Sequence, residues 1–347
     1  MYPRGRRLRR LRPEPRREGT GAPRPLLEGG VFDLTAVARH YPVGRAWPSG
    51  GAILRAVDGV DLSVTPGETL ALVGESGCGK STLARLLLRL ERPTAGTVRF
   101  RGRDLWGLSR AEVRGFRRQV QLVFQDPYAS LNPRLRVEEI VGEALDIHRL
   151  AAGQARRQRV LDLLGQVGLP SEALDGYPHQ FSGGQRQRIG IARALAAEPA
   201  LLVADEPVSA LDVSVQAQIL NLLQDLQAAR GLTYVFISHD LRVVEHVADR
   251  VAVMYLGRIV ESAPVGDFYR EPLHPYSRAL LEAVPAPDPE RPNALPPLSG
   301  DVPSPVAPPP GCPFHPRCPN AFEPCSREVP IRAPQGTGRQ VCCHLWR

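Results

Sequence analysis

The chain has 347 residues, 43% of them hydrophobic and 23% charged, and a formal net charge of +8. That length and apolar content suffice for the core of one large α/β domain together with a smaller unit. No apolar run approaches the roughly 20 residues that a membrane-spanning helix needs, so we expect a soluble or peripheral protein.

Residues 1–30 predict a disordered, arginine-rich tail. Positions 1–24 carry nine arginines against two glutamates, which accounts for seven of the eight net positive charges. The segment has few large apolar residues and no hydrophobic stretch typical of a secretory signal. We expect the tail to stay solvated, with contact to anionic lipid as the alternative. The nearly neutral remainder argues against a nucleic-acid-binding surface.

A phosphate-binding loop is predicted at residues 74–81, GESGCGKS. The apolar stretch Thr69–Val73 precedes it and a predicted helix, Thr82–Leu90, follows it. A glycine-rich turn between a strand and a helix directs backbone amides and the helix dipole at one point, which suits a polyphosphate. Lys80 would reach the β and γ phosphates, and the Ser81 hydroxyl would ligate Mg²⁺. The predicted nucleotide contacts here are Gly74, Glu75, Ser76, Gly77, Cys78, Gly79, Lys80, Ser81 and Thr82.

The next predicted strand is Val120–Phe124, and Gln125 follows it directly. From about 128 to 199 the pattern turns helical and poor in strands. Helices are predicted at Val137–Leu150 and Gln158–Val167. This segment should form a helical subdomain.

A second anion-binding element is predicted at FSGGQ, residues 181–185. Apolar residues recur at helical spacing directly after it, so Ser182 is a predicted N-cap whose hydroxyl and nearby amides can bind an anion. As a bare string SGG indicates only a turn. Its place upstream of an acidic strand end favours the anion-binding interpretation.

Two adjacent carboxylates, Asp205 and Glu206, end a run typical of a buried parallel strand, Ala200–Ala204. Beside a phosphate loop on a neighbouring strand, Asp205 would organise magnesium and Glu206 would face the attacking water. A helix is then predicted at Val213–Arg230, with Asp212 as its N-cap.

A further predicted strand, Thr233–Ile237, carries His239 to the same edge of the sheet, and Val251–Val260 predicts a hairpin that turns at Leu256 and Gly257. Proline becomes dense from Pro264 onward.

Five of the six cysteines gather near the end of the chain: Cys312, Cys318, Cys325, Cys342 and Cys343. Grouped thiols in a cytosolic protein favour a metal centre over disulfides. Iron–sulfur, zinc with His315 or His344 as a substitute ligand, and no metal at all remain open from the residues.

These motifs, in this order, resemble the ATP-binding cassette (ABC) family. FSGGQ is similar to its signature motif, with Phe181 where the family usually has leucine. The strings VFQDPYASLNPR (123–134) and HPYSRALLEAVP (274–285) resemble the ATP-binding subunits of dipeptide and oligopeptide importers, including the nickel-importing branch. The resemblance extends from about Phe32 to the end and does not cover the arginine-rich tail.

The resemblance implies an α/β fold: a P-loop NTPase cassette with a RecA-like mixed-sheet core, an antiparallel β part, a helical signature subdomain and a small cysteine-containing C-terminal extension. The implied nucleotide-binding domain covers 31–264, with the helical subdomain at about 128–199. The region typical of oligopeptide importers, with its proline-rich linker and cysteines, covers 265–347.

Residue roles follow from the resemblance. Glu206 would be the general base, His239 would contact the γ phosphate, and Gln125 would touch magnesium and the lytic water while linking to the membrane partner. Together with Lys80 these are the expected catalytic residues. The expected magnesium ligands are Ser81, Gln125 and Asp205.

The remaining expected ATP contacts lie outside the phosphate loop. Tyr41 would stack on adenine, and the loop Ser209–Asp212 would make dimer contacts, with Asp212 near the nucleotide. The signature residues would contact the γ phosphate held by a second protomer; they are Ser182, Gly183, Gly184 and Gln185.

The implied function is ATP hydrolysis that drives import of di- or oligopeptides at the cytoplasmic face of the membrane. The implied partners are a second ATPase subunit, identical or related, two membrane permeases and an external solute-binding protein, with no nucleic acid. The implied cofactors are ATP and Mg²⁺. Some similar subunits also hold a four-iron cluster, here on Cys312, Cys318, Cys325 and Cys343, with Cys342 as an extra thiol.

Three alternatives remain: an importer ATPase for nickel or another small solute, a soluble cassette ATPase acting on nucleic acid, and a non-hydrolysing regulatory cassette. The presence of Lys80, Asp205, Glu206 and His239 together argues against the last.

Overall fold

The computed structural model describes residues 30–43, 51–126, 128–284 and 300–346. The predicted disordered tail, apart from Gly30, and much of the proline-rich linker lie outside the described residues.

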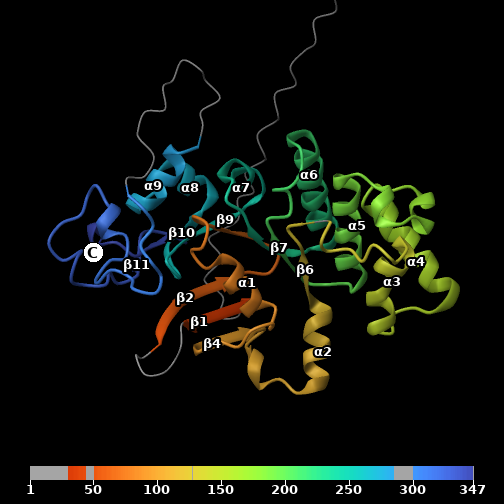
Figure 1. Ribbon diagram of the computed structural model, residues 1–347, viewed down its shortest axis with the longest axis horizontal. Coiled ribbons are helices and arrows are strands. Elements are labelled where there is room, and N and C mark those ends of the chain that lie inside the picture. The colour runs from red at the N-terminus through yellow and green to blue at the C-terminus, as the bar shows by residue number, and fades with distance from the viewer. Residues whose placement is uncertain (1–29, 44–50, 127, 285–299, 347) are drawn as a thin grey trace, which may run out of the picture.

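An eight-stranded mixed sheet forms the centre of the molecule (Figure 1), in the order β11-β12-β10-β9-β3-β8-β7-β6. The neighbouring pairs from β9 to β6 are parallel, and β10 and β12 pair antiparallel. β3, β7 and β8 are buried along almost their whole length, which explains their unbroken apolar sequences. The bounds are β3 Thr69–Val73, β6 Val120–Val123, β7 Leu201–Asp205, β8 Thr233–Ile237, β9 Arg250–Tyr255, β10 Arg258–Pro264, β11 Ala333–Pro334 and β12 Gln340–Val341.

A second, antiparallel sheet has the order β2-β1-β4-β5. Its apolar face packs on the central sheet and on α1 (Lys80–Leu87) through a buried cluster that includes Phe32, Leu83 and Val98. The bounds are β1 Phe32–Val43, β2 Ala52–Val64, β4 Ala95–Phe100 and β5 Arg103–Asp104.

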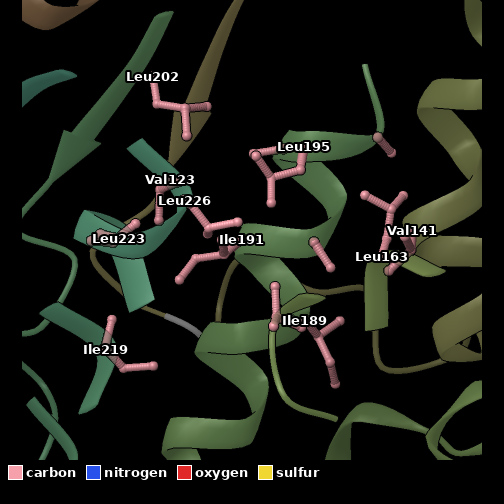
Figure 2. Close-up of a cluster of buried hydrophobic side chains, with 14 of the residues drawn as sticks. Val123, Val141, Leu163, Ile189, Ile191, Leu195, Leu202, Ile219, Leu223 and Leu226 are labelled. Atoms are coloured by element: carbon pink, nitrogen blue, oxygen red, sulfur yellow. The ribbon is translucent and has the colours of Figure 1, made fainter. Parts of the chain in front are cut away.

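Helices between β6 and β7 form a lobe beside the sheet (Figure 1). In Figure 2, α5 lies between Leu223 and Leu226 of α6 on one side and Val141 and Leu163, from α3 and α4, on the other. In the lobe the bounds are α3 Val137–Ile147, α4 Gly153–Gln166 and α5 Gly183–Ala196, with 3₁₀ turns at Ser171–Asp175 and Pro178–Gln180. Outside it, α2 Arg110–Gln119 and the 3₁₀ turn Leu105–Gly107 precede β6, and α6 Val213–Arg230 follows β7.

The boundaries of three helices, α1, α3 and α4, differ from the predictions. α1 begins at Lys80 and ends at Leu87, and α3 ends at Ile147. Arg89 and Arg149, just beyond these two ends, have positive φ values of 55° and 54°, which a helix cannot continue through. α4 begins at Gly153, five residues before the predicted start. The sequence pattern does not indicate these first turns because they are polar and have no apolar period.

The C-terminal residues lie on the opposite side of the sheet from the helical lobe (Figure 1). They pack on β9 and β10 through a cluster that includes Tyr255, Tyr276 and Phe314. The bounds are α7 Leu241–Val247, α8 Val265–Arg270 and α9 Pro275–Glu282, with 3₁₀ turns at His315–Arg317 and His344–Trp346.

In the described parts of the chain, every helix is too short or too polar to span a bilayer.

Candidate nucleotide site

The phosphate loop has a backbone that only glycine can adopt at two points. Gly74 has φ 149° and Gly79 has φ 111°. A Cβ at Gly74 would lie 2.2 Å from the Met254 carbonyl oxygen, and one at Gly79 would lie 2.1 Å from that of Ala56. The glycines therefore let the loop pass close against neighbouring strands while it turns into α1.

Lys80 is buried, with 6% of its surface exposed. Its ammonium donates hydrogen bonds to the carbonyl oxygens of Gly74, at 2.7 Å, and Glu75, at 3.0 Å. The charge is thus held inside the loop at the start of the helix.

Three predicted catalytic side chains meet at the carboxyl ends of parallel strands. Gln125, after β6, donates from Nε2 to Glu206 Oε2 at 2.9 Å. His239, after β8, places Nδ1 3.1 Å from Glu206 Oε1. Glu206 itself has φ 45°, a conformation that non-glycine residues rarely adopt and that is typical of functional positions.

Asp205 at the end of β7 interacts with the Ser81 hydroxyl, which joins two predicted magnesium ligands. Burial raises the pKa of the Asp205 carboxyl, and the Glu206 charge raises it further, while the Ser81 hydrogen bond opposes both. Two adjacent carboxylates beside a hydroxyl are oxygen ligands of the kind that Mg²⁺ prefers, and a bound cation would favour the ionised form of Asp205.

These side chains surround a hollow of about 770 Å³. The predicted residues among those lining it are Tyr41, Ser76, Gly77, Gly79, Lys80, Ser81, Thr82, Gln125, Glu206 and His239. Gly74, Glu75, Cys78 and Asp205 are not among the described residues that line it. Burial raises the pKa of the Cys78 thiol, in keeping with a small residue packed inside the loop.

Tyr41 forms one wall of the hollow and is fixed from two sides. Its hydroxyl donates to the Glu91 carboxylate, and the Arg39 guanidinium lies 4.4 Å from the ring centroid. The ring is therefore held in a set orientation beside the loop.

Sequence analysis missed five lining residues, which are Leu54, Ala56, Arg85, Glu91 and Pro305. Arg85 lies on α1 and Glu91 just after it, whereas Leu54 and Ala56 lie on β2 and Pro305 lies in the C-terminal region, so the five form no local pattern. The Pro305 carbonyl accepts a hydrogen bond from the backbone N–H of Arg55 at 3.1 Å, so the C-terminal region itself reaches the hollow.

The signature residues begin α5 as predicted. Ser182 caps the helix in a reciprocal pair: Ser182 Oγ accepts from the Gln185 N–H at 3.3 Å and Gln185 Oε1 accepts from the Ser182 N–H at 2.9 Å. A Cβ on Gly184 would lie 2.4 Å from Val215 Cγ1, so glycine is needed where α5 crosses α6. None of Ser182, Gly183, Gly184 and Gln185 is among the described residues that line the hollow.

The predicted dimer-contact loop, Ser209–Asp212, lies next to the signature: a Cβ on Gly183 would meet Leu211 Cδ2 at 3.4 Å. Asp212 occupies the predicted N-cap position of α6, although its side chain makes no capping hydrogen bond. The side chain is exposed instead.

Four of the C-terminal cysteines lie together. Burial raises the pKa of the Cys312 thiol to about 11, with Cys343, Cys325 and Cys318 as further causes. For Cys342 burial again raises the pKa, but its charged neighbours are Arg332, Arg258 and Asp61. Cys343 is therefore the member of the adjacent pair that belongs to the group of four, which the sequence left open.

The predictions of a metal centre on the C-terminal cysteines are not confirmed. Within the described residues, no three or more His, Cys, Asp and Glu side chains are arranged to hold a metal ion. The two histidines considered as substitute ligands contact backbone carbonyls: His315 Nδ1 lies 2.9 Å from the oxygen of Cys312, and His344 Nε2 lies 2.8 Å from that of Glu328.

Comparisons with known proteins agree with this geometry. Residues 57–209 match the family described as ABC transporter, and residues 260–325 match the one described as oligopeptide/dipeptide transporter, C-terminal region. Among solved structures, the dimeric ATP-binding cassette MJ0796 bound to ADP and Pi has a TM-score of 0.60 at 32% identity, covering 67% of this chain and 98% of that one. The structure of cbiO1 from Clostridium perfringens, part of the complex cbiONQ, also has a TM-score of 0.60, at 26% identity, covering 70% and 92%.

Sequence relatives cover nearly the whole chain. The probable peptide ABC transporter ATP-binding protein y4tS of Sinorhizobium fredii is 53% identical, covering 92% of this chain and 91% of that protein. The putative oligopeptide transport ATP-binding protein YkfD of Bacillus subtilis is 52% identical, covering 93% and 96%. The di/tripeptide transport ATP-binding protein DppF of Pseudomonas aeruginosa is 53% identical, covering 90% and 97%. The chain belongs to the ABC transporter family, among the ATP-binding subunits of its oligopeptide/dipeptide branch.

Proposed function

We propose that this protein is the ATP-hydrolysing subunit of an importer for di- or oligopeptides and works at the cytoplasmic face of the membrane. The observation that carries the proposal is the meeting of Gln125, Glu206 and His239 beside a hollow that also holds Lys80 and Ser81. Phosphoryl transfer to water needs this set: a cation for the phosphates, a magnesium site, and a group that orients the water.

Each residue has a distinct task in hydrolysis. Lys80 and the loop amides bind the β and γ phosphates, and Ser81, Asp205 and Gln125 are the residues that would hold Mg²⁺, which offsets the charge developing on the phosphates. Glu206 accepts the proton of the attacking water or orients it. His239, whose Nδ1 is 3.1 Å from Glu206 Oε1, would contact the γ phosphate.

The site is completed by a second ATPase subunit. Within one chain the signature helix end lies outside the hollow, with Ser182 and Gln185 exposed. The backbone amides of Gly183 and Gly184, which lie outside the capping pair, and the positive end of the α5 dipole suit an anion supplied by another protomer. The similar cassette MJ0796 was solved as a dimer with ADP and Pi, which supports the same arrangement here. The partner is a second copy or a related subunit.

Membrane permeases dock on a groove beside Gln125. The groove, a hollow of about 340 Å³, is lined by Leu90, Phe124 and Ile147 among others. These three side chains are 62%, 44% and 58% exposed, an unusual concentration of apolar surface. Phe124 directly precedes Gln125. A permease that displaces Phe124 would therefore also move Gln125 and change its hydrogen bond with Glu206.

Peptide is the proposed cargo because the three relatives described above are named for peptide, oligopeptide or di/tripeptide transport. Two permeases carry the cargo and an external binding protein delivers it. Nickel or another small solute is the alternative within the family. A nucleic-acid function is disfavoured because seven of the eight net positive charges lie in residues 1–24. In this proposal, residues 31–264 form the nucleotide-binding domain and residues 265–347 form the C-terminal region typical of oligopeptide importers.

The experiment that tests the function uses vesicles holding the two permeases and both ATPase subunits, with the binding protein outside. We expect ATP inside the vesicles to drive uptake of di- or oligopeptide. Replacing Glu206 by Gln should leave nucleotide binding intact and lower both hydrolysis and uptake at least about a hundredfold, the scale of losing a general base. Normal steady-state hydrolysis in Glu206→Gln would contradict the assigned role, and nickel uptake without peptide uptake would select the alternative cargo.

A [4Fe–4S] cluster on Cys312, Cys318, Cys325 and Cys343 is the second part of the proposal. The four grouped thiols match the usual ligands of such a cluster in kind and number, and their present arrangement would have to close around it, since as described they are not arranged to hold a metal ion. A cationic centre there would also relieve the mutual repulsion of the four sulfurs once they ionise. Held on the side of the sheet away from the helical lobe, it would brace the C-terminal region.

The cluster is tested on anaerobically purified protein by its visible spectrum and its iron and sulfide content. Cys343→Ser should lose most of the iron, and Cys342→Ser, the matched control, should keep it. Equal iron content in both variants, or zinc in place of iron, would refute the cluster assignment.

A further inference from the structure

The C-terminal region reaches the phosphate loop through Arg317. Its guanidinium forms two hydrogen bonds with the Glu75 carboxylate, 2.8 Å from Nη1 to Oε2 and 3.0 Å from Nη2 to Oε1. The Arg317 side chain is 5% exposed and that of Glu75 is 27% exposed. A shielded, two-point contact of this kind fixes the orientation of the carboxylate as well as its distance.

Glu75 is held at its backbone as well. Its N–H donates to the Tyr276 hydroxyl at 2.9 Å, and its carbonyl oxygen accepts from Lys80 Nζ at 3.0 Å. Tyr276 is fully buried and packs against Tyr255 and Phe314, with ring centroids 4.7 and 5.4 Å apart. Side chain, amide and carbonyl of this one loop residue are therefore all engaged.

The contacts form a continuous series from the C-terminal region to the phosphate-binding cation. Arg317 fixes the Glu75 side chain, and the Glu75 carbonyl is one of the acceptors that hold the Lys80 ammonium. Lys80 is the only lysine in the sequence. Without Arg317, the carboxylate loses its two-point partner, and the backbone of Glu75 depends on its hydrogen bonds with Tyr276, Cys78 and Lys80 alone.

We propose that Arg317 is a positioning residue of the ATP site, which sets the affinity for nucleotide by orienting Glu75 and through it Lys80. The inference rests on the proposed ATP-hydrolysing function and adds that the C-terminal region is part of the nucleotide site rather than an appendage. Pro305 supports it independently, because it brings the same region to the wall of the hollow.

The test measures the Kd of Mg²⁺–ATP for the full-length chain by displacement of a fluorescent ATP analogue. Arg317→Gln should raise this Kd about tenfold, the scale of one charge-assisted hydrogen bond. Glu75→Gln should do the same, and the double variant should be no worse than either single one, because the two residues act as one unit. Arg317→Lys keeps the positive charge but cannot make the two parallel hydrogen bonds of a guanidinium. Its Kd should lie between those of wild type and Arg317→Gln.

The matched control is Arg327→Gln, which removes an arginine from an exposed pair with Glu323 in the same region. It should leave the Kd unchanged. Thermal unfolding of every variant separates a local effect from loss of the fold. If Arg317→Gln fails to fold, the Arg317→Lys result decides.

Unchanged ATP affinity in folded Arg317→Gln or Arg317→Lys would overturn the inference, as would additive losses in the double variant. Wild-type protein that binds no ATP would instead refute the proposed function.

Discussion

At the scale of single residues, Glu206 shows how the fold supports chemistry. It follows β7 directly, and its N–H bonds to the Ile237 carbonyl of β8 at 3.0 Å, which anchors a residue whose φ of 45° is otherwise unfavourable. Gln125 and His239, from the two strands on either side of β7, then hold both carboxylate oxygens. Three neighbouring strands therefore orient the proposed base.

His274 serves structure rather than chemistry. It is completely buried, and its Nδ1 accepts a hydrogen bond from the Tyr276 N–H at 3.0 Å, which caps α9. The Glu261 carboxylate accepts from the backbone N–H groups of Leu273 and His274, at 2.9 and 2.8 Å. Burial lowers the pKa of His274 to about 3, so the ring stays neutral in the folded protein.

The neutral ring predicts a pH dependence of stability. Below the ordinary pKa of 6.5 the unfolded chain takes up a proton at His274 that the folded chain does not, until the pH falls to about 3. The contribution of the neutral His274 ring to the free energy of unfolding is therefore complete above pH 6.5. Below that pH it falls by about 1.4 kcal/mol for each pH unit. His274→Asn, which keeps a capping oxygen, should show a shallower fall of the unfolding midpoint between pH 7 and 5 than wild type.

The control for this prediction is His246→Asn, which replaces an exposed histidine and should keep the wild-type slope. An identical slope in His274→Asn and wild type would show that His274 is not the group responsible.

At the scale of elements, the sequence predicts best where one physical cause acts alone. The strands β3, β7 and β8 are continuous apolar runs because they are buried on both faces, and each leads into a functional residue. The N-cap of α5 follows from Ser182 and Gln185, whose reciprocal hydrogen bonds need only residues three apart.

Other parts of the site could not be predicted because they depend on contacts between distant segments. Arg317 lies 242 positions from Glu75, and nothing beside it in sequence distinguishes it from the other arginines. Pro305 is one proline in a proline-rich stretch. The choice of Cys343 over Cys342 depends on the neighbours of each thiol, which are the other three cysteines for Cys343 and Arg332, Arg258 and Asp61 for Cys342. The start of α4 could not be predicted for a local reason, because its first turns are polar and show no apolar period.

At the scale of the whole molecule, the phosphate loop and the signature motif lie on different parts of the fold. The loop belongs to the central sheet and the signature to the helical lobe (Figure 1), and α5 is packed against α3, α4 and α6 by a buried apolar cluster (Figure 2). This packing presents the signature as a rigid surface. In the proposed assembly one chain would provide half of each of two ATP sites, and ATP would join the two subunits.

The measurement that tests this claim most directly is the mass of Glu206→Gln in solution, by light scattering, with Mg²⁺–ATP or Mg²⁺–ADP, alone and mixed with its related ATPase subunit. We predict that ATP, but not ADP, doubles the mass in at least one of the two samples. Adding Gly183→Asp should abolish the doubling while the loop still binds nucleotide, because a carboxylate at the signature repels the γ phosphate. A monomer at saturating ATP in both samples, or a dimer that tolerates Gly183→Asp, would contradict the account.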